Sequence, residues 1–192
     1  MVSNGSGVVR SVSNRADFIW SVADLLRGDY KQSEYGKVIL PLTVIRRLDC
    51  VLESTKSAAL KRSSSLKGKV ENVEPVLQHV AGRKFYNTSR LDFKKLLDDQ
   101  NNVTADLRAY IAGFSSKARD VIKKFGFKTQ IDRLDKAGLL YKVIARFTDF
   151  DFHPDVVSNI KVGYLYKKLI RKFSELSNEA VGAHFTQEKL SS

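Results

Sequence analysis

Apolar residues recur at three- and four-residue steps along most of this chain, and this helical periodicity is the feature that most restricts how it can fold. The pattern is most regular after Ser33, which can cap a helix. Its apolar positions are Tyr35, Val38, Ile39, Leu42, Ile45, Leu48 and Leu52. Pro41 lies inside this pattern, so we expect a kink and a free carbonyl at Lys37. No stretch alternates apolar and polar residues as a half-buried strand does. The sequence therefore predicts an all-α fold, a compact multi-helix bundle.

Capping residues and helix breakers divide the rest of the chain into further predicted helices. Asn14 can cap the first of these, and Gly28 closes it. Shorter apolar patterns occupy residues 70–80, 91–97, 103–114, 116–125, 129–147 and about 161–173. In two of them Val121 and Ile170 are expected to face the core. Thr129 and Asp132 have the spacing of a capping box.

The Ser/Gly-rich N-terminus has no periodicity, so we expect residues 1–13 to be a flexible arm. A helical domain over residues 14–178 follows it. The chain has no apolar run near the ~20 residues that a membrane-spanning helix needs. Its first residues also lack the apolar centre of a signal peptide. We therefore expect a cytoplasmic protein with no membrane contact.

Net charge is the strongest compositional signal. The chain has 33 Lys and Arg against 21 Asp and Glu, a formal charge of +12. Such an excess favours a polyanion such as DNA or RNA, although solvated basic faces also occur without such a partner. Arg46 and Arg47 lie on the polar face of the most regular helix. They could contact phosphate, but a solvent-facing position is the favoured interpretation.

Basic residues that we expect to contact DNA phosphates fall in three stretches. They are Lys56, Lys61, Arg62, Lys67 and Lys69 around a predicted mobile loop, Lys123 and Lys124 on one helix, and Lys167, Lys168, Arg171 and Lys172 on the last helix. None of these stretches has the balance of acidic residues that would neutralise it. Contacts of this kind hold a nucleic-acid backbone without reading its sequence.

Sequence motifs of nucleotide-binding and hydrolytic enzymes are absent, including the Walker loop, the Gly-x-Ser-x-Gly elbow and the His-Glu-x-x-His pair. Asp149, Asp151 and Asp155 lack the glycine and terminal glutamate of a calcium loop, so we expect turns and caps there and no metal site. Cys50 is the single cysteine and cannot form an internal disulfide. We expect it to be a small buried apolar residue.

Seven short segments after residue 14 share their order and spacing with one protein family. They are Leu25-Leu-Arg-Gly, Ser33-Glu-Tyr, Leu107-Arg-Ala-Tyr-Ile-Ala-Gly-Phe-Ser, Leu134-Asp-Lys-Ala-Gly-Leu-Leu-Tyr, His153-Pro-Asp-Val-Val-Ser-Asn, Gly163-Tyr-Leu-Tyr-Lys-Lys-Leu-Ile-Arg-Lys-Phe and Gly182-Ala-His-Phe-Thr. With these segments the chain resembles the N-terminal part of the methylation (modification) subunit of type I restriction-modification systems.

The resemblance implies a helical domain that precedes a Rossmann-like, S-adenosylmethionine-dependent domain for methylation of adenine N6 in DNA. In this family two modification subunits assemble with one specificity subunit, which reads the target sequence, and restriction subunits can join them. Adenine N6 is buried in a base pair, so the target base must be flipped while the duplex is held. The helical domains are expected to close around the duplex as a clamp.

Catalytic residues of the family are not expected in this chain. The family uses a glycine-rich cofactor loop and an Asn/Asp-Pro-Pro-Tyr/Phe motif, but no two prolines are adjacent here. Residues 179–192 are then the start of a linker into the methyltransferase domain, and the 192-residue chain alone is expected to be inactive. The resemblance implies that Phe185 and Thr186 contact S-adenosylmethionine in the full-length subunit. Gln187 departs from the proline that the family usually has there.

Three functional hypotheses follow. The first is a DNA clamp that also takes part in subunit assembly. The second is a structural adaptor that docks the specificity subunit, or its own catalytic domain, without touching DNA. The third is a free-standing helical regulator that binds RNA or DNA, which would require the resemblance to be accidental.

Overall fold

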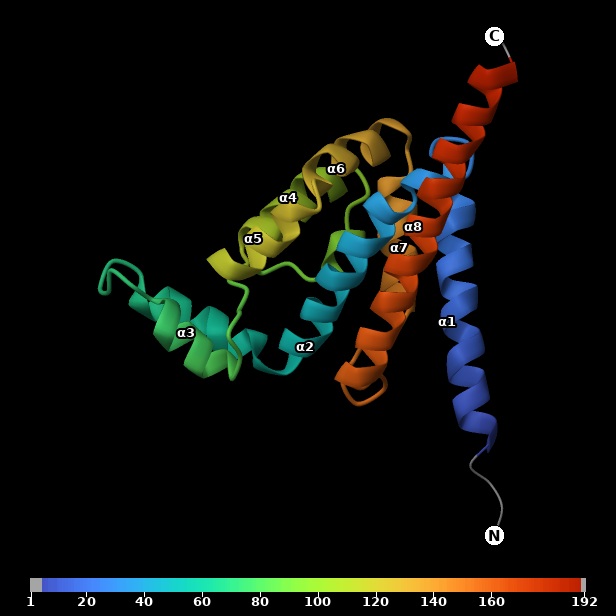
Figure 1. Ribbon diagram of the computed structural model, residues 1–192. Coiled ribbons are helices and arrows are strands. Elements are labelled where there is room, and N and C mark those ends of the chain that lie inside the picture. The colour runs from blue at the N-terminus through green and yellow to red at the C-terminus, as the bar shows by residue number, and fades with distance from the viewer. Residues whose placement is uncertain (1–4, 191–192) are drawn as a thin grey trace.

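The computed structural model describes the backbone of residues 5–190 and the side chains of residues 15, 17–179 and 182 (Figure 1). Over this range the chain forms eight α-helices, two short 3-10 helices and no β-strand. The prediction of an all-α fold is confirmed. The elements are α1 (Gly5–Leu26), η1 (Gln32–Glu34), α2 (Gly36–Leu66), α3 (Glu74–Ala81), η2 (Lys95–Leu97), α4 (Val103–Ala112), α5 (Ser116–Lys124), α6 (Phe127–Lys136), α7 (Leu140–Asp149) and α8 (Asn159–Leu190).

The long helix α2 is the centre of the bundle, since α3, α5, α6, α7 and α8 all pack against it. Figure 1 shows α4, α5 and α6 gathered on one side of α2, with α8 on the other. Val38, Leu42 and Ile45 are fully buried, as their spacing predicts. Pro41 is also buried within the helix, and Thr43 Oγ1 donates a 2.7 Å hydrogen bond to the Ile39 carbonyl beside it.

Two boundaries of α2 differ from the prediction. Ser33 belongs to the 3-10 helix η1, and Tyr35 occupies the N-cap position of α2. At the other end, the predicted mobile loop after Lys56 is wrong, because α2 continues to Leu66 and turns only at Gly68, with φ of +74°. Buried Ala59 and Leu66 explain the extension, since packing of an apolar face stabilises a helix through residues of modest propensity.

Helix α1 begins at Gly5 and not at the predicted cap Asn14, so residues 5–13 of the expected flexible arm belong to it. Residues 1–4 of that arm lie outside the described part of the chain. The helix ends before Gly28, where φ is +97°. Phe18 anchors it by an edge contact with Phe147, at 5.0 Å between ring centroids, and by stacking on Phe150 at 4.6 Å.

Three shorter predictions need correction. Val121 and Ile170 face solvent, with 46% and 43% of their surface exposed, because their neighbours on α5 and α8 already fill the core. The helix expected over residues 91–97 is reduced to the single turn η2, and the Lys95 N–H at its start donates a 2.8 Å hydrogen bond to Asp92 Oδ1. Thr129 lies inside α6, since Gly126 and not Thr129 holds the N-cap position.

Helix α8 lies against η1 and α2. Ser158 caps it, with its Oγ 3.4 Å from the Lys161 N–H. Leu169 and Phe173 are buried, and the Phe173 ring lies within 3.2 Å of the position that a Cβ on Gly36 would occupy. The absence of a side chain at Gly36 therefore lets α8 approach the start of α2 closely.

A single arginine joins the turn between α1 and α2 to α6. Arg133 forms two bonds to the Glu34 carboxylate, at 2.9 and 3.2 Å, and a third to the Asp29 carbonyl at 2.6 Å. Its guanidinium also lies 3.8 Å from the centroid of the Tyr30 ring. Hydrogen bonds from Arg133 and from the Lys31 N–H lower the pKa of Glu34 from 4.5 to about 2. This contact supports η1, on which α8 rests.

The Glu34 contact predicts an acid-sensitive contribution to stability. Because the folded protein lowers the pKa of Glu34, this contribution is complete above pH 4.5 and is lost as the pH falls from 4.5 towards 2. We expect Glu34→Gln to reduce the free energy of unfolding by about 1–2 kcal/mol at pH 6 and by almost nothing at pH 2, measured by urea denaturation. Asp24→Asn, which removes an exposed ion pair with Arg27, should change little at either pH. A Glu34→Gln effect that is equal at both pH values would contradict this prediction.

Candidate nucleic-acid interface

The outer face of α8 carries the most concentrated group of predicted phosphate contacts. Lys167, Lys168, Arg171 and Lys172 are all exposed, because Leu169 and Phe173 turn the opposite face towards the core. Lys167 and Arg171 are four residues apart, as are Lys168 and Lys172, so the four side chains form two neighbouring rows along the helix. Arg171 makes an exposed ion pair with Glu175, at 3.3 Å. No carboxylate among the described residues pairs with the three lysines. We call these four residues the α8 basic face.

Exposed apolar side chains precede the α8 basic face. Ile160 has 74% of its surface exposed and Tyr164 has 65%. Steps of three and four residues place Tyr164 on the same side of the helix as Lys167 and Arg171. The outward side of α8 therefore changes from apolar to basic along its length.

The other predicted contacts lie elsewhere on the molecule. Lys61 and Arg62 are exposed on α2, and Lys67 and Lys69 are exposed in the turn that follows it. Figure 1 places this end of α2 beside α3, away from α8. Lys123 and Lys124 are exposed at the end of α5. The fold thus distributes the predicted contacts over three regions and does not join them into one surface.

Lys56 makes its contacts within the protein. Its ammonium donates a hydrogen bond to the Leu91 carbonyl and lies 5.0 Å from the centroid of the Tyr110 ring. Burial lowers its pKa, although the nearby Asp49 carboxylate opposes that shift. We therefore leave Lys56 out of the proposed phosphate contacts.

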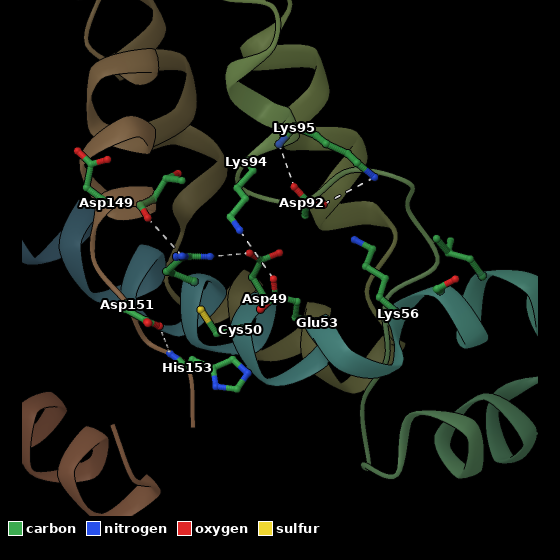
Figure 2. Close-up of a pocket in the computed structure, with 14 residues that line it drawn as sticks. Asp49, Cys50, Glu53, Lys56, Asp92, Lys94, Lys95, Asp149, Asp151 and His153 are labelled. Atoms are coloured by element: carbon green, nitrogen blue, oxygen red, sulfur yellow. Dashed lines mark hydrogen bonds and ion pairs between the residues drawn. The ribbon is translucent and has the colours of Figure 1, made fainter. Parts of the chain in front are cut away.

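A polar cavity of about 530 Å³ opens beside Lys56, between α2, the segment around η2 and the connection from α7 to α8 (Figure 2). Asp49 lies at its inner end. One carboxylate oxygen accepts a 2.8 Å bond from Arg46, and the other accepts a 2.8 Å bond from the Tyr110 hydroxyl. Burial raises the pKa of Asp49, while these two bonds act in the opposite direction.

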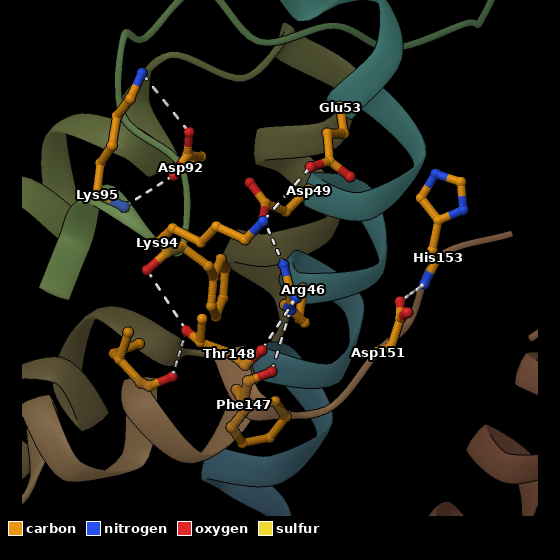
Figure 3. A network of polar contacts seen from close by, with 12 residues as sticks. Arg46, Asp49, Glu53, Asp92, Lys94, Lys95, Phe147, Thr148, Asp151 and His153 are labelled. Atoms are coloured by element: carbon orange, nitrogen blue, oxygen red, sulfur yellow. Dashed lines mark hydrogen bonds and ion pairs between the residues drawn. The ribbon is translucent and has the colours of Figure 1, made fainter. Parts of the chain in front are cut away.

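The two arginines of α2 do not occupy either of the positions that we expected, because both are buried. Arg46 reaches the α7 terminus, with bonds of 3.1 Å to the Phe147 carbonyl and 3.3 Å to the Thr148 carbonyl (Figure 3). Both the phosphate and the solvent-facing interpretations are wrong for this residue. Its spacing from Leu42 was the available signal of burial, since residues four apart share a helix face.

Arg47 holds the connection between α7 and α8. One of its nitrogens donates to the Phe152 carbonyl at 2.5 Å and to the Val157 carbonyl at 2.8 Å. Another donates to Asn159 Oδ1, at 2.6 Å, at the first residue of α8. Burial lowers its pKa. Arg47 is therefore a residue that positions the start of α8, a role that its sequence neighbours do not indicate.

Charged groups in the cavity are mostly paired with each other. Glu53 lies 3.8 Å from Lys94, and Asp92 lies 3.7 Å from Lys95. Asp151 accepts a 2.8 Å bond from the His153 N–H, which is the turn role expected for it. Within the described residues, no group of three or more His, Cys, Asp and Glu side chains could hold a metal ion.

Cys50 lies at the cavity wall and is buried, as predicted. Burial raises the pKa of its thiol, which keeps it in the poorly nucleophilic protonated form. The cavity therefore offers a largely balanced set of charges that ties three segments together, and no activated nucleophile.

Phe185 and Thr186, the expected cofactor contacts, lie in the part of α8 whose side chains fall outside the described residues. None of the helices in the described chain has the length and apolar character needed to cross a bilayer.

Comparison with models of known families gives a match over more than half of the chain. A family model described as the HsdM N-terminal domain matches residues 16–147, from α1 to α7. A search of curated proteins and a search of solved structures returned no match.

The contacts of Arg47 predict a specific loss of stability. Arg47→Met keeps much of the side-chain volume but leaves the Phe152 and Val157 carbonyls without their donor. We expect the free energy of unfolding to fall by about 2–4 kcal/mol in urea denaturation, since buried unsatisfied acceptors are costly. Amide hydrogen exchange at the start of α8 should accelerate. Arg62→Met, on an exposed part of the same helix, should change stability by less than about 0.5 kcal/mol. Equal effects of the two substitutions would contradict the positioning role.

Proposed function

Because the chain belongs to the HsdM N-terminal domain family, which is the N-terminal domain of the modification subunit of type I restriction-modification systems, we propose that it grips duplex DNA. The α8 basic face is the surface that carries this proposal. Its three lysines, which pair with no carboxylate of the described residues, and Arg171 lie within six residues of one another on one exposed side of a helix. A spacing of this kind suits contacts with successive phosphates along one strand.

The clamp reads no sequence in this proposal. Lysine ammonium groups meet phosphates without distinguishing bases, so target choice belongs to the specificity subunit. Flipping adenine out of the stack disrupts the local duplex, which must stay held in register meanwhile. Phosphate contacts on a rigid helix serve that purpose, because they fix position and leave the bases free.

We assign methyl transfer to adenine N6 to the methyltransferase domain of the full-length subunit and not to this domain. None of its prolines, Pro41, Pro75 and Pro154, stands next to another, so the family's Pro-Pro motif does not occur here. S-adenosylmethionine supplies the methyl group to the complete subunit. Phe185 and Thr186 are proposed to contact it there.

The remaining proposed partners are the specificity subunit, a second modification subunit and the restriction subunit, assembled in the cytoplasm. A second candidate function, the structural adaptor, is favoured by one observation. Ile160 and Tyr164 are exposed at the start of α8, and Val156 just before it is 56% exposed. Apolar side chains in such positions suit a protein interface better than a phosphate backbone.

Charge reversal of the α8 basic face tests the clamp. We expect the variant Lys167→Glu, Lys168→Glu, Arg171→Glu, Lys172→Glu to bind labelled duplexes of unrelated sequence more weakly, and by a similar factor, in fluorescence anisotropy titrations. The dependence of log K on log salt should become shallower by up to about 3.6, since each of the four lost phosphate contacts removes about 0.9 from the slope.

A control with equal charge separates local contacts from net charge. Lys31→Glu, Lys84→Glu, Lys136→Glu and Lys142→Glu alter four exposed residues outside the predicted contacts. Each set of four reversals lowers the formal net charge by eight, from +12 to +4. The proposal of a DNA clamp is wrong if both variants show the same loss of DNA affinity and the same change in salt dependence. Two results together would establish the adaptor instead. The variant Ile160→Asp, Tyr164→Asp would no longer co-purify with the specificity subunit, and the α8 reversal would bind DNA as the unchanged protein does.

A further inference from the structure

A second surface, which shares no lining residue with the cavity beside Lys56, is formed where α4, α5 and α6 meet. These helices enclose an open groove of about 650 Å³. Its floor is apolar, and the accessible part of it is the half-buried Ile111 and the exposed Ala112. Ile122, Phe127 and Ile131 also line the groove but are already buried in the core of the domain. Gly126, with φ of +62°, connects α5 directly to α6 and forms part of the same wall. None of the described residues of α8 lines this groove.

Positive charge surrounds this apolar floor. Arg108, Arg119, Lys123 and Lys128 line the groove, against one carboxylate, Asp120. Arg108 is paired with Asp132, and Arg119 donates to the Ala112 carbonyl at 3.1 Å. Lys123 and Lys128 are exposed and form no ion pair with any described residue. They lie on either side of the Gly126 turn, so one end of the groove is cationic.

We propose that this groove binds an amphipathic helix of a partner protein, with its apolar side chains on the floor and its acidic side chains against Lys123 and Lys128. Amphipathic helices bind in this way by laying an apolar stripe into a groove. Carboxylates flanking the stripe complement the lysines and give the helix its orientation.

Duplex DNA fits the groove less well than such a helix. A phosphate backbone could reach the two lysines, but it has no apolar group to bury against Ile111 and Ala112. The partner chemistry therefore follows from the floor and the rim together. This inference adds a binding surface to the subunit-assembly role proposed above, and it reassigns Lys123 from phosphate contact to protein contact.

The probes for this site are two synthetic 18-residue helical peptides that share one leucine stripe. In the first the flanking positions are glutamate, and in the second they are lysine. We expect the glutamate peptide to bind the 192-residue chain in fluorescence anisotropy titrations. The affinity of the lysine peptide should be lower by a factor of roughly ten or more, because repulsion replaces the ion pairs with Lys123 and Lys128.

Charge reversal of the rim provides the decisive comparison. Lys123→Glu, Lys128→Glu should weaken binding of the glutamate peptide and strengthen binding of the lysine peptide. The matched control, Lys117→Glu, Lys124→Glu, changes two exposed lysines of α5 that do not line the groove. It should leave the preference for the glutamate peptide in place. A preference that both variants reverse equally would show a general charge effect and overturn the proposal.

A steric variant tests the floor without removing core side chains. Ala112 is exposed and lines the groove, so Ala112→Trp should fill it and abolish peptide binding while circular dichroism and the unfolding midpoint stay unchanged. Peptide binding that persists in a folded Ala112→Trp protein would exclude the groove as the binding site.

Duplex DNA distinguishes this site from the clamp. We expect DNA affinity to fall in the α8 reversal but to stay near that of the control variant in Lys123→Glu, Lys128→Glu. If DNA displaces the glutamate peptide and the rim variant no longer binds DNA, the two lysines contact DNA, and the proposal of a protein-binding groove is overturned. Failure of the α8 reversal alone would contradict only the clamp.

Discussion

The attachment of the α7–α8 connection to α2 by two buried arginines is the interaction on which the functional surface depends. A buried guanidinium is tolerated only where acceptors replace the water that it loses. Arg46 has the Asp49 carboxylate, which Tyr110 supports from the other side, and two carbonyls at the end of α7. The acceptors of Arg47 among the described residues are all neutral: two carbonyls and Asn159. The chain must return to these donors after α7, which fixes where α8 begins.

A second attachment determines how α8 is rotated. Phe173 packs against the backbone at Gly36, where a side chain would crowd its ring. One contact at the first residue of α8 and another fourteen residues later hold the helix at two points. A helix held in this way cannot turn about its axis without breaking one of them. The lysines on its far side therefore keep a constant orientation, which favours contacts with a regularly spaced backbone of phosphates.

Local patterns in the sequence predicted what depends on local geometry. Leu42 and Ile45 are buried because they share a face of one helix, and periodicity shows that directly. The partners of Arg47 lie 105 to 112 residues away, and the carbonyl that accepts from Lys56 lies 35 residues away. No pattern within one helix contains that information, so basic residues inside the fold and basic residues on its surface looked alike. The Ser63-Ser-Ser run suggested a loop, yet tertiary packing of Leu66 outweighed those propensities.

The surroundings of a charge decide which partner it suits. On α8, Lys168 and Lys172 flank a hydrated helix face, where long-range attraction to a polyanion operates without any need for shape. At the turn between α5 and α6, Lys123 and Lys128 line the same groove as Ile111 and Ala112, whose apolar side chains remain accessible. A partner gains there from covering the apolar floor as well as from neutralising the charge. An apolar helix with carboxylates at its edge covers the apolar floor and also neutralises the lysines, whereas a phosphate backbone only neutralises the lysines. One domain with a high positive charge can therefore hold DNA on one helix and a protein segment on another, without competition between them.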